Sequence, residues 1–198
     1  MRKIAVFCGS SSGQSEMYTK AAQKLGNEFA SRDIKLIYGG GAVGIMGAVA
    51  NAVLEGKGTV TGVMPKMLEE REIAHPELTE LVIVDSMHER KSTMAELADG
   101  FLILPGGAGT MEEFFEVFTW AQLGLHAKPI GILNIDGYYE PLLNMLDHMV
   151  RESFLHESFL SMLLIGSDSG RLVDTMMTYE APSIQRYVND NSIDYDDM

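Results

Sequence analysis

The chain has 198 residues, 46% of them hydrophobic, so it fits one domain of ordinary size with a substantial core. Its formal net charge of −13 argues against an extended DNA or RNA surface, although a small anion needs only a local pocket of N–H groups and a cation. The single cysteine excludes an internal disulfide, and no apolar run is long enough for a membrane span or a signal peptide. We therefore expect a cytoplasmic protein without nucleic-acid or membrane partners, with one domain over residues 1–185 and an acidic, frayed tail over 186–198.

Short apolar or β-branched runs recur along the chain, and segments with helical spacing separate them. Nearly continuous apolar strands that alternate with helices are typical of a parallel sheet covered on both faces. The sequence thus predicts a single-domain, Rossmann-like, doubly wound α/β fold, in which ligands bind at the turns that follow the strands. The predicted strands are residues 3–8, 34–39, 59–64, 81–85, 100–105, 129–134 and 162–166.

The first strand ends in "CGSSSG" (8–13), a turn that leads into a helix expected to start near Ser15. Gly9 and Ser10 offer N–H groups and a hydroxyl that suit a phosphate or a ribose, but the turn is equally typical of an ordinary Ser-capped helix. We interpret Cys8 as a small buried hydrophobic residue and not as a nucleophile.

The second strand runs into "YGGGAVGIMG" (38–47), whose glycine spacing matches the dinucleotide-binding fingerprint. That fingerprint normally follows the first strand, and a carboxylate then ends the next strand. Here the third strand ends at Val63-Met64-Pro65 without a carboxylate. We interpret Gly39, Gly40, Gly41 and Gly44 as a loop that lets part of a nucleotide approach the backbone closely, and we do not expect NAD or FAD.

The fourth strand leads into "DSMHERKSTM" (85–94), a cationic cluster at the start of a helix. Arg90 can clamp a phosphate with two parallel hydrogen bonds, which a lysine cannot match. For Lys91 alone, as for Glu89, a solvated helix face is the favoured interpretation. We interpret His88 as a surface or capping residue. The histidines are scattered and no Cys/His cluster exists, so we expect no metal site.

The strongest signal is the glycine-rich turn "PGGAGT" (105–110) and the helix that follows it. Thr110 is the predicted N-cap of this helix. The apolar spacing predicts one buried helical face. The residues of that face are Phe114, Val117, Phe118 and Ala121.

Two adjacent glutamates follow this turn and are expected to have different surroundings. At about 100° per residue, Glu112 points away from the buried face, as do Glu116 and Thr119, whereas Glu113 lies at its edge. Carboxylates in a first helical turn are also typical of plain compensation of the helix dipole. However, an anion held by the turn would compete with the carboxylates for the positive potential at the helix N-terminus. The two acids therefore indicate chemistry on a cationic or hydroxylated group beside the anion, such as the ribose of a nucleotide.

The motif "PGGAGTMEE" fits Pro-Gly-Gly-x-Gly-Thr-x-x-Glu, and "MHERK" and "YGGGAVGIMG" precede it in the chain. With these motifs in this order, the chain resembles the Lonely Guy (LOG) family of cytokinin riboside 5'-monophosphate phosphoribohydrolases. The resemblance runs from residue 3 to about residue 150 and includes "TWAQLGLHAKPIGILNIDGYY".

The resemblance implies hydrolysis of the N-glycosidic bond of a cytokinin riboside 5'-monophosphate without a cofactor, and the sequence leaves open whether adenine, as in AMP, or an N6-prenylated adenine is the preferred base. It also implies that Arg90 and Glu113 form the catalytic pair, and that the protein is a homodimer with active sites near the interface. A dimer would account for more aromatic residues than one core face needs. The turns and the resemblance together give these substrate contacts: Gly9, Ser10, Gly40, Gly41, Glu72, Lys91, Gly106, Gly107, Ala108, Gly109, Thr110, Met111, Glu112 and Thr119.

Two alternatives remain open from the sequence. A nucleotide-binding or sensing protein would use the same loops without hydrolysis, although such a protein has no need of a carboxylate such as Glu113 beside its anion. A lysine decarboxylase would need a lysine that forms a Schiff base with pyridoxal phosphate, and nothing in the sequence marks one.

Overall fold

Seven parallel strands form one sheet in the computed structural model, which describes residues 1–69 and 74–182. All seven predicted strands are confirmed, with ends that differ by at most two residues from the predicted ones. Their order across the sheet is β4-β3-β2-β1-β5-β6-β7. The strands are β1 (Lys3–Phe7), β2 (Lys35–Tyr38), β3 (Val60–Pro65), β4 (Glu80–Val84), β5 (Gly100–Ile103), β6 (Ile130–Leu133) and β7 (Leu163–Gly166).

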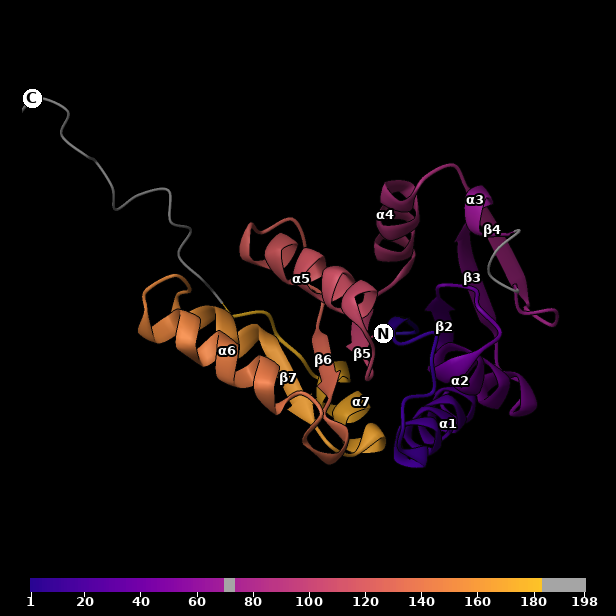
Figure 1. Cartoon of the computed structure of the whole chain (residues 1–198), viewed down its shortest axis with the longest axis horizontal. Coiled ribbons are helices and arrows are strands. Elements are labelled where there is room, and N and C mark those ends of the chain that lie inside the picture. Colours follow the sequence, from indigo (N-terminus) through magenta and orange to yellow (C-terminus); the bar gives the residue numbers. More distant parts are fainter. Residues whose placement is uncertain (70–73, 183–198) are drawn as a thin grey trace, which may run out of the picture.

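Helices cover both faces of the sheet, as the doubly wound fold requires (Figure 1). One face carries α1 (Glu16–Ser31), α2 (Gly44–Glu55) and α7 (Ser169–Met177), and the other carries α4 (Met87–Leu97), α5 (Ala108–Gln122) and α6 (Glu140–Arg151). Three short elements complete the chain: α3 (Lys66–Glu69), η1 (Ile135–Gly137) and η2 (Glu157–Met162).

The central strand β1 shows why the runs are apolar throughout. Ile4 and Val6 point into the core under α1 and α2, whereas Ala5 and Phe7 point into the core under α4 and α5. Because both faces are buried, each residue from Ile4 to Phe7 contributes to a core, and Lys3 at the start of the strand is exposed. A fully buried large apolar side chain contributes about 1.5–3 kcal/mol to folding, so the two cores hold the sheet and its turns in place.

The strand order reverses between β1 and β5, so the loops that follow these two strands lead to opposite faces and leave a crevice. The loops are nevertheless tied together, because the Gly9 N–H donates to the Pro105 carbonyl at 3.0 Å. The loop after β2 also packs against the loop after β1. Gly44 has φ +64°, and a Cβ there would lie 2.3 Å from the Ser10 carbonyl oxygen, so only glycine fits.

Predictions about two helix starts have different outcomes. Ser15 caps α1 by accepting the Met17 N–H, as expected. Thr110 is not an N-cap: α5 begins at Ala108, Gly107 is its N-cap, and Thr110 is buried in the first turn against Gly106. The two neighbouring glutamates consequently lie in the second turn, where compensation of the helix dipole has largely faded.

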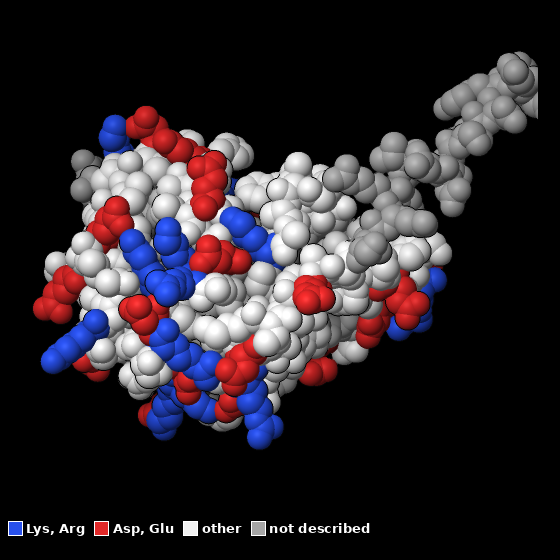
Figure 2. Space-filling view, turned by 180° about the vertical axis from the view of Figure 1, so that it is seen from behind, with Lys and Arg blue, Asp and Glu red and all other residues white. Residues whose placement is uncertain are grey.

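The buried face predicted for α5 is confirmed, since all four of its residues are buried. In the part of the chain that the structure describes, no helix combines the length and the apolar character that crossing a membrane requires. On the face shown in Figure 2, basic and acidic side chains are intermingled and form no continuous basic area. The expected tail over 186–198 lies outside the described residues.

Candidate active site

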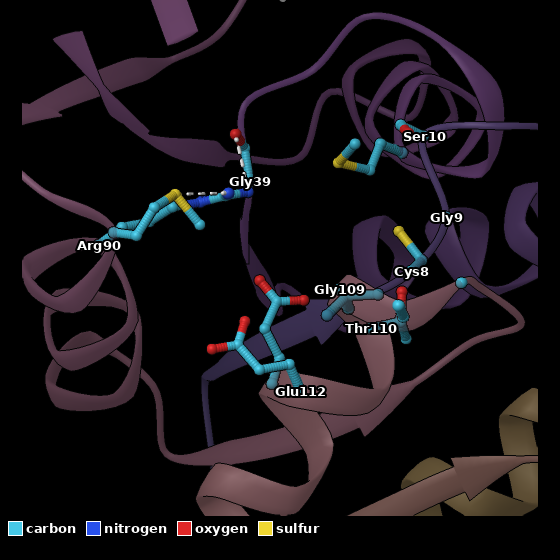
Figure 3. A pocket seen from close by; sticks show the side chains of 14 residues that line it. Cys8, Gly9, Ser10, Gly39, Arg90, Gly109, Thr110 and Glu112 are labelled. Carbon is cyan, nitrogen blue, oxygen red and sulfur yellow. Dashed lines mark hydrogen bonds between the residues drawn. The ribbon is translucent and has the colours of Figure 1, made fainter. Parts of the chain in front are cut away.

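A cavity of about 300 Å³ opens at the carboxyl ends of β1, β2 and β5, where α2, α4 and α5 begin (Figure 3). All three expected glycine- or serine-rich turns contribute to it. Its lining is Val6, Cys8, Gly9, Ser10, Gly39, Met46, Met87, Arg90, Gly107, Ala108, Gly109, Thr110, Glu112 and Glu113.

The N-terminus of α5 forms one wall of the cavity and has no side-chain cap. The first N–H groups of a helix have no intrahelical acceptor, and the helix dipole adds positive potential there. At Gly107 and Gly109, an added Cβ would meet no atom of residues 1–69 or 74–182 within 4 Å. Packing inside the protein therefore does not require these two glycines, and the backbone is open to a bound group.

Arg90 reaches the cavity from α4 and is only 7% exposed (Figure 3). One guanidinium nitrogen donates to the Gly39 carbonyl at 3.4 Å, and the buried Nε has no hydrogen-bond partner among the described residues. A Cβ at Gly39 would lie 2.0 Å from this guanidinium, so the glycine makes room for it. Arg90 forms no ion pair with any described residue. A buried cation without a counterion is costly, which favours an anion in the cavity.

Glu113 projects from α5 into the same cavity. Burial raises the pKa of its carboxyl group to about 7, although the positive charge of Arg90 lowers it and the Glu112 carboxylate raises it further. A carboxyl group that titrates near neutral pH can hold or release a proton under ordinary conditions. Such a group beside a cation in a cleft is typical of an active site.

The apolar part of the lining consists of Val6, Cys8, Met46 and Met87, and the Met87 sulfur accepts a hydrogen bond from Arg90 at 3.8 Å. Burial raises the pKa of the Cys8 thiol well above its usual range, so the thiol stays protonated, in agreement with the interpretation as a hydrophobic residue. Sequence reasoning missed both methionines. The available signal was their place in the first turns of helices that begin at the crevice.

The structure brings most of the predicted site residues together. Those that line the cavity are Gly9, Ser10, Arg90, Gly107, Ala108, Gly109, Thr110, Glu112 and Glu113. Those that lie outside its lining are Gly40, Gly41, Lys91, Gly106, Met111 and Thr119. Glu72 lies outside the described residues.

The residues outside the lining have other contacts. The Gly40 carbonyl accepts the His75 N–H at 3.0 Å, and the Gly41 carbonyl accepts the Tyr38 hydroxyl at 3.1 Å. Gly106 lies behind the cavity wall, where the Tyr138 hydroxyl donates to its carbonyl at 2.6 Å. These glycines shape the turns that support the site.

The interpretation of Lys91 as part of a solvated helix face is wrong. Its side chain is 7% exposed, and its ammonium group contacts carboxylates of α5. The reason is that α5 packs beside α4, which the local pattern around residue 91 does not reveal. No group of three or more His, Cys, Asp or Glu side chains among residues 1–69 and 74–182 could hold a metal ion.

Solved structures with the same fold include two that act in cofactor handling. A molybdenum cofactor binding protein from Rippkaea orientalis has a TM-score of 0.68 and 18% identity, and the match covers 89% of this chain and 98% of that one. A molybdenum cofactor carrier protein from Chlamydomonas reinhardtii also has a TM-score of 0.68 and 18% identity, and the match covers 90% of this chain and 99% of that one. At this identity the likeness shows the fold alone.

Sequence relatives are much closer. The family described as "Possible lysine decarboxylase" matches residues 46–176. Cytokinin riboside 5'-monophosphate phosphoribohydrolase LOG7 from Arabidopsis thaliana is 49% identical over 90% of this chain and 82% of its own length. The corresponding LOG3 of the same plant is 46% identical over 93% of this chain and 86% of its own length. Probable cytokinin riboside 5'-monophosphate phosphoribohydrolase LOGL2 from Oryza sativa subsp. japonica is 45% identical over 95% of this chain and 77% of its own length. The chain belongs to the Lonely Guy family of cytokinin riboside 5'-monophosphate phosphoribohydrolases.

Proposed function

We propose that the protein hydrolyses the N-glycosidic bond of cytokinin riboside 5'-monophosphates, and of AMP, to the free base and ribose 5-phosphate. The observation that carries this proposal is the pairing of two groups in one cavity. Arg90 is a buried cation without an ion-pair partner among the described residues, and Glu113 is a carboxyl group with a pKa of about 7.

The 5'-phosphate occupies the N-terminal end of α5 in this proposal. Uncapped N–H groups at a helix start bind phosphate, and Gly107 and Gly109 leave the backbone accessible. Arg90 provides the positive charge on the opposite side of the cavity (Figure 3). The phosphate thus compensates the buried guanidinium and sets the position of the ribose.

Glu113 acts at the anomeric carbon. When the C1'–N bond breaks, its electron pair leaves with the base and positive, oxocarbenium-like charge develops on the ribose. An ionised carboxylate beside that carbon stabilises the charge and accepts a proton from the attacking water, whose oxygen bonds to C1'. The departing base takes up a proton from solvent, and Glu113 then releases the proton that it accepted, so water supplies both the hydroxyl group on C1' and the proton on the base. The base then lies against the apolar part of the lining, which consists of Val6, Cys8, Met46 and Met87.

The test is to incubate the protein with AMP and isopentenyladenosine 5'-monophosphate, and in parallel with the two unphosphorylated nucleosides. Free base is followed by chromatography. We expect base from the monophosphates only, because the phosphate site is needed for productive binding. Equal release from the nucleosides would contradict the phosphate assignment, and binding without any release would favour the nucleotide-sensing alternative.

The decarboxylase description of the matching family finds no support in the cavity. Schiff-base chemistry needs a free lysine amine, and no lysine lines the cavity among the described residues. The nearby Lys91 is held by two carboxylates. Production of cadaverine from lysine by the purified protein with added pyridoxal phosphate would overturn this conclusion.

We also propose a cytoplasmic homodimer with the cavity near its interface. Phe114 and Phe118 belong to the core, whereas Phe115 and Trp120 are only partly buried. Just beyond Trp120, Leu125 is 69% exposed. Light scattering should give twice the chain mass of 21.8 kDa, and Leu125→Asp should reduce it. A monomeric wild-type protein would contradict the proposal.

A further inference from the structure

Lys91 is a buried cation that lies next to the cavity but does not line it. Its Nζ is 2.7 Å from Glu112 Oε1 and 3.0 Å from Glu116 Oε1. Glu112 and Glu116 are one helical turn apart and present their carboxylates on the same side of α5. The ammonium group therefore uses its hydrogen-bonding capacity within the protein and has little left for a ligand.

This ion-pair cluster connects the two helices that carry the catalytic pair. Lys91 follows Arg90 in α4, and Glu112 precedes Glu113 in α5. Adjacent residues on a helix point about 100° apart. Arg90 lines the cavity whereas Lys91 does not, and Glu112 binds Lys91 while it lines the cavity together with Glu113. The ion pair between Lys91 and Glu112 thus links α4 to α5 directly beside the catalytic pair.

The same cluster determines the charge around Glu113. Besides burial, the groups that act on its carboxyl are Arg90 and Lys91 from α4 and Glu112 and Glu116 from its own helix. The Cys8 thiol at the end of β1 also faces it and is protonated. The two carboxylates raise the pKa of Glu113 and the two cations lower it. Lys91 offsets the carboxylates directly, because it binds both.

We propose that Lys91 is a positioning residue of this site: its ammonium group binds Glu112 and Glu116, holds α4 against α5, and thereby sets the position and charge of Glu113 in the cavity. Lys91 does not contact the substrate. The consequence for the reaction rests on the proposed function, whereas the consequence for Glu113 itself can be measured without any turnover.

The first readout is the dependence of kcat/KM on pH for the wild type, Lys91→Met and Lys91→Arg with AMP as substrate. Loss of the ammonium group leaves two uncompensated carboxylates beside Glu113. The acid limb of the profile should therefore move up by about one pH unit in Lys91→Met, with KM on the alkaline plateau changed less than about threefold. Lys91→Arg should restore the wild-type limb. An increased KM with an unmoved limb would overturn the proposal in favour of a substrate contact.

Glu116→Gln gives a matched test on the other side of the ion pair, because Glu116 does not line the cavity. Removing its carboxylate removes one group that raises the pKa of Glu113, so the limb should move down instead of up. This variant also keeps the proposal testable if Lys91→Met does not fold. If Lys91→Met does not fold, an unmoved limb in Glu116→Gln would reduce Lys91 to a structural residue.

The second readout does not depend on activity. The melting temperature is measured against pH for the wild type and Lys91→Met, each with and without Glu113→Gln. The difference within each pair isolates the titration of Glu113, and its midpoint should be about one pH unit higher in Lys91→Met. A wild type that releases no base would sink the proposed function, whereas equal midpoints here would overturn the role of Lys91.

Discussion

Glycine residues around the cavity fall into two groups that differ in their surroundings. At Gly39 and Gly44 an added Cβ would collide with Arg90 or with the Ser10 carbonyl, so these glycines allow parts of the protein to approach one another. At Gly107 and Gly109 the space is open. In the second group the missing side chain serves a molecule that comes from outside, which is the nucleotide in our proposal.

Gly109→Ala separates stability from binding. Gly109 lies inside α5 with an ordinary backbone conformation, so alanine should stabilise the free protein by about 0.5–1 kcal/mol. The new methyl group would occupy the phosphate position, and we expect KM for AMP to rise about tenfold, equivalent to about 1.4 kcal/mol. Thermal unfolding and initial rates measure the two effects.

Gly39→Ala is the contrast, because its Cβ would displace Arg90. This variant should lose both stability and affinity. If Gly109→Ala changes neither the melting temperature nor KM, the open space beside Gly109 does not hold substrate.

Glu113→Gln should stabilise the protein in a way that depends on pH. Since burial raises the pKa of Glu113 from 4.5 to about 7, the stability gained from its protonated form is full below pH 4.5 and is lost as the pH rises through 7. Glutamine at position 113 does not ionise, so the variant does not lose this stability at high pH. Its advantage in free energy of unfolding should be near zero at pH 4 and about 3 kcal/mol at pH 8, at 1.36 kcal/mol per pKa unit. Urea unfolding at both pH values provides the measurement, and an equal difference at both would contradict the raised pKa.

At the scale of elements, the helix starts show which features can be predicted from the sequence and which cannot. The strand runs and the three turns follow from local apolar patterns and glycine spacing, and so does the buried face of α5. The N-cap of α5 does not, because Thr110 has a suitable side chain but is buried within the first turn, packed against Gly106, which itself lies against Gly9 of the loop after β1. Lys91 likewise depends on α5, whose position beside α4 follows from the sheet order and not from the residues near position 91.

The start of α4 offers a prediction for an element. Ser86 caps this helix by accepting the Glu89 N–H at 3.1 Å, and Ser86→Ala should cost about 1 kcal/mol, or about 2–4 °C in melting temperature. Because α4 carries Arg90, KM for AMP should rise as well. Ser15→Ala removes the corresponding cap of α1, which contributes no residue to the cavity, and should lower the melting temperature alone. Equal KM values in the two variants would show that the start of α4 does not position Arg90.

At the scale of the whole molecule, the reversal of strand order between β1 and β5 places the site. It explains why turns that are far apart in the sequence meet, and why the sheet itself contributes few side chains to the cavity. The sequence indicates that such a crevice exists. Which glycines line it and which support it from behind depends on how the three loops pack, and this required the structure.

Ligand binding should stabilise the whole domain, because the phosphate joins α4 and α5 across the crevice. AMP at about 100 times its Kd should add about 2.7 kcal/mol, or about 5–10 °C in melting temperature. Adenosine at the same concentration should add far less, and Arg90→Gln should abolish the effect of AMP. A similar shift with adenosine would place the binding energy on the base and not on the phosphate.

The most direct measurement of the central claim is turnover of isopentenyladenosine 5'-monophosphate by Glu113→Gln, with its affinity measured in parallel by calorimetry. Glu96→Gln, at an exposed carboxylate of α4 outside the cavity, is the matched control. If the Glu113 carboxylate stabilises the developing positive charge, kcat should fall by at least about a hundredfold in Glu113→Gln while Kd stays within a few fold, and Glu96→Gln should match the wild type. A Glu113→Gln variant that retains wild-type turnover would contradict the account.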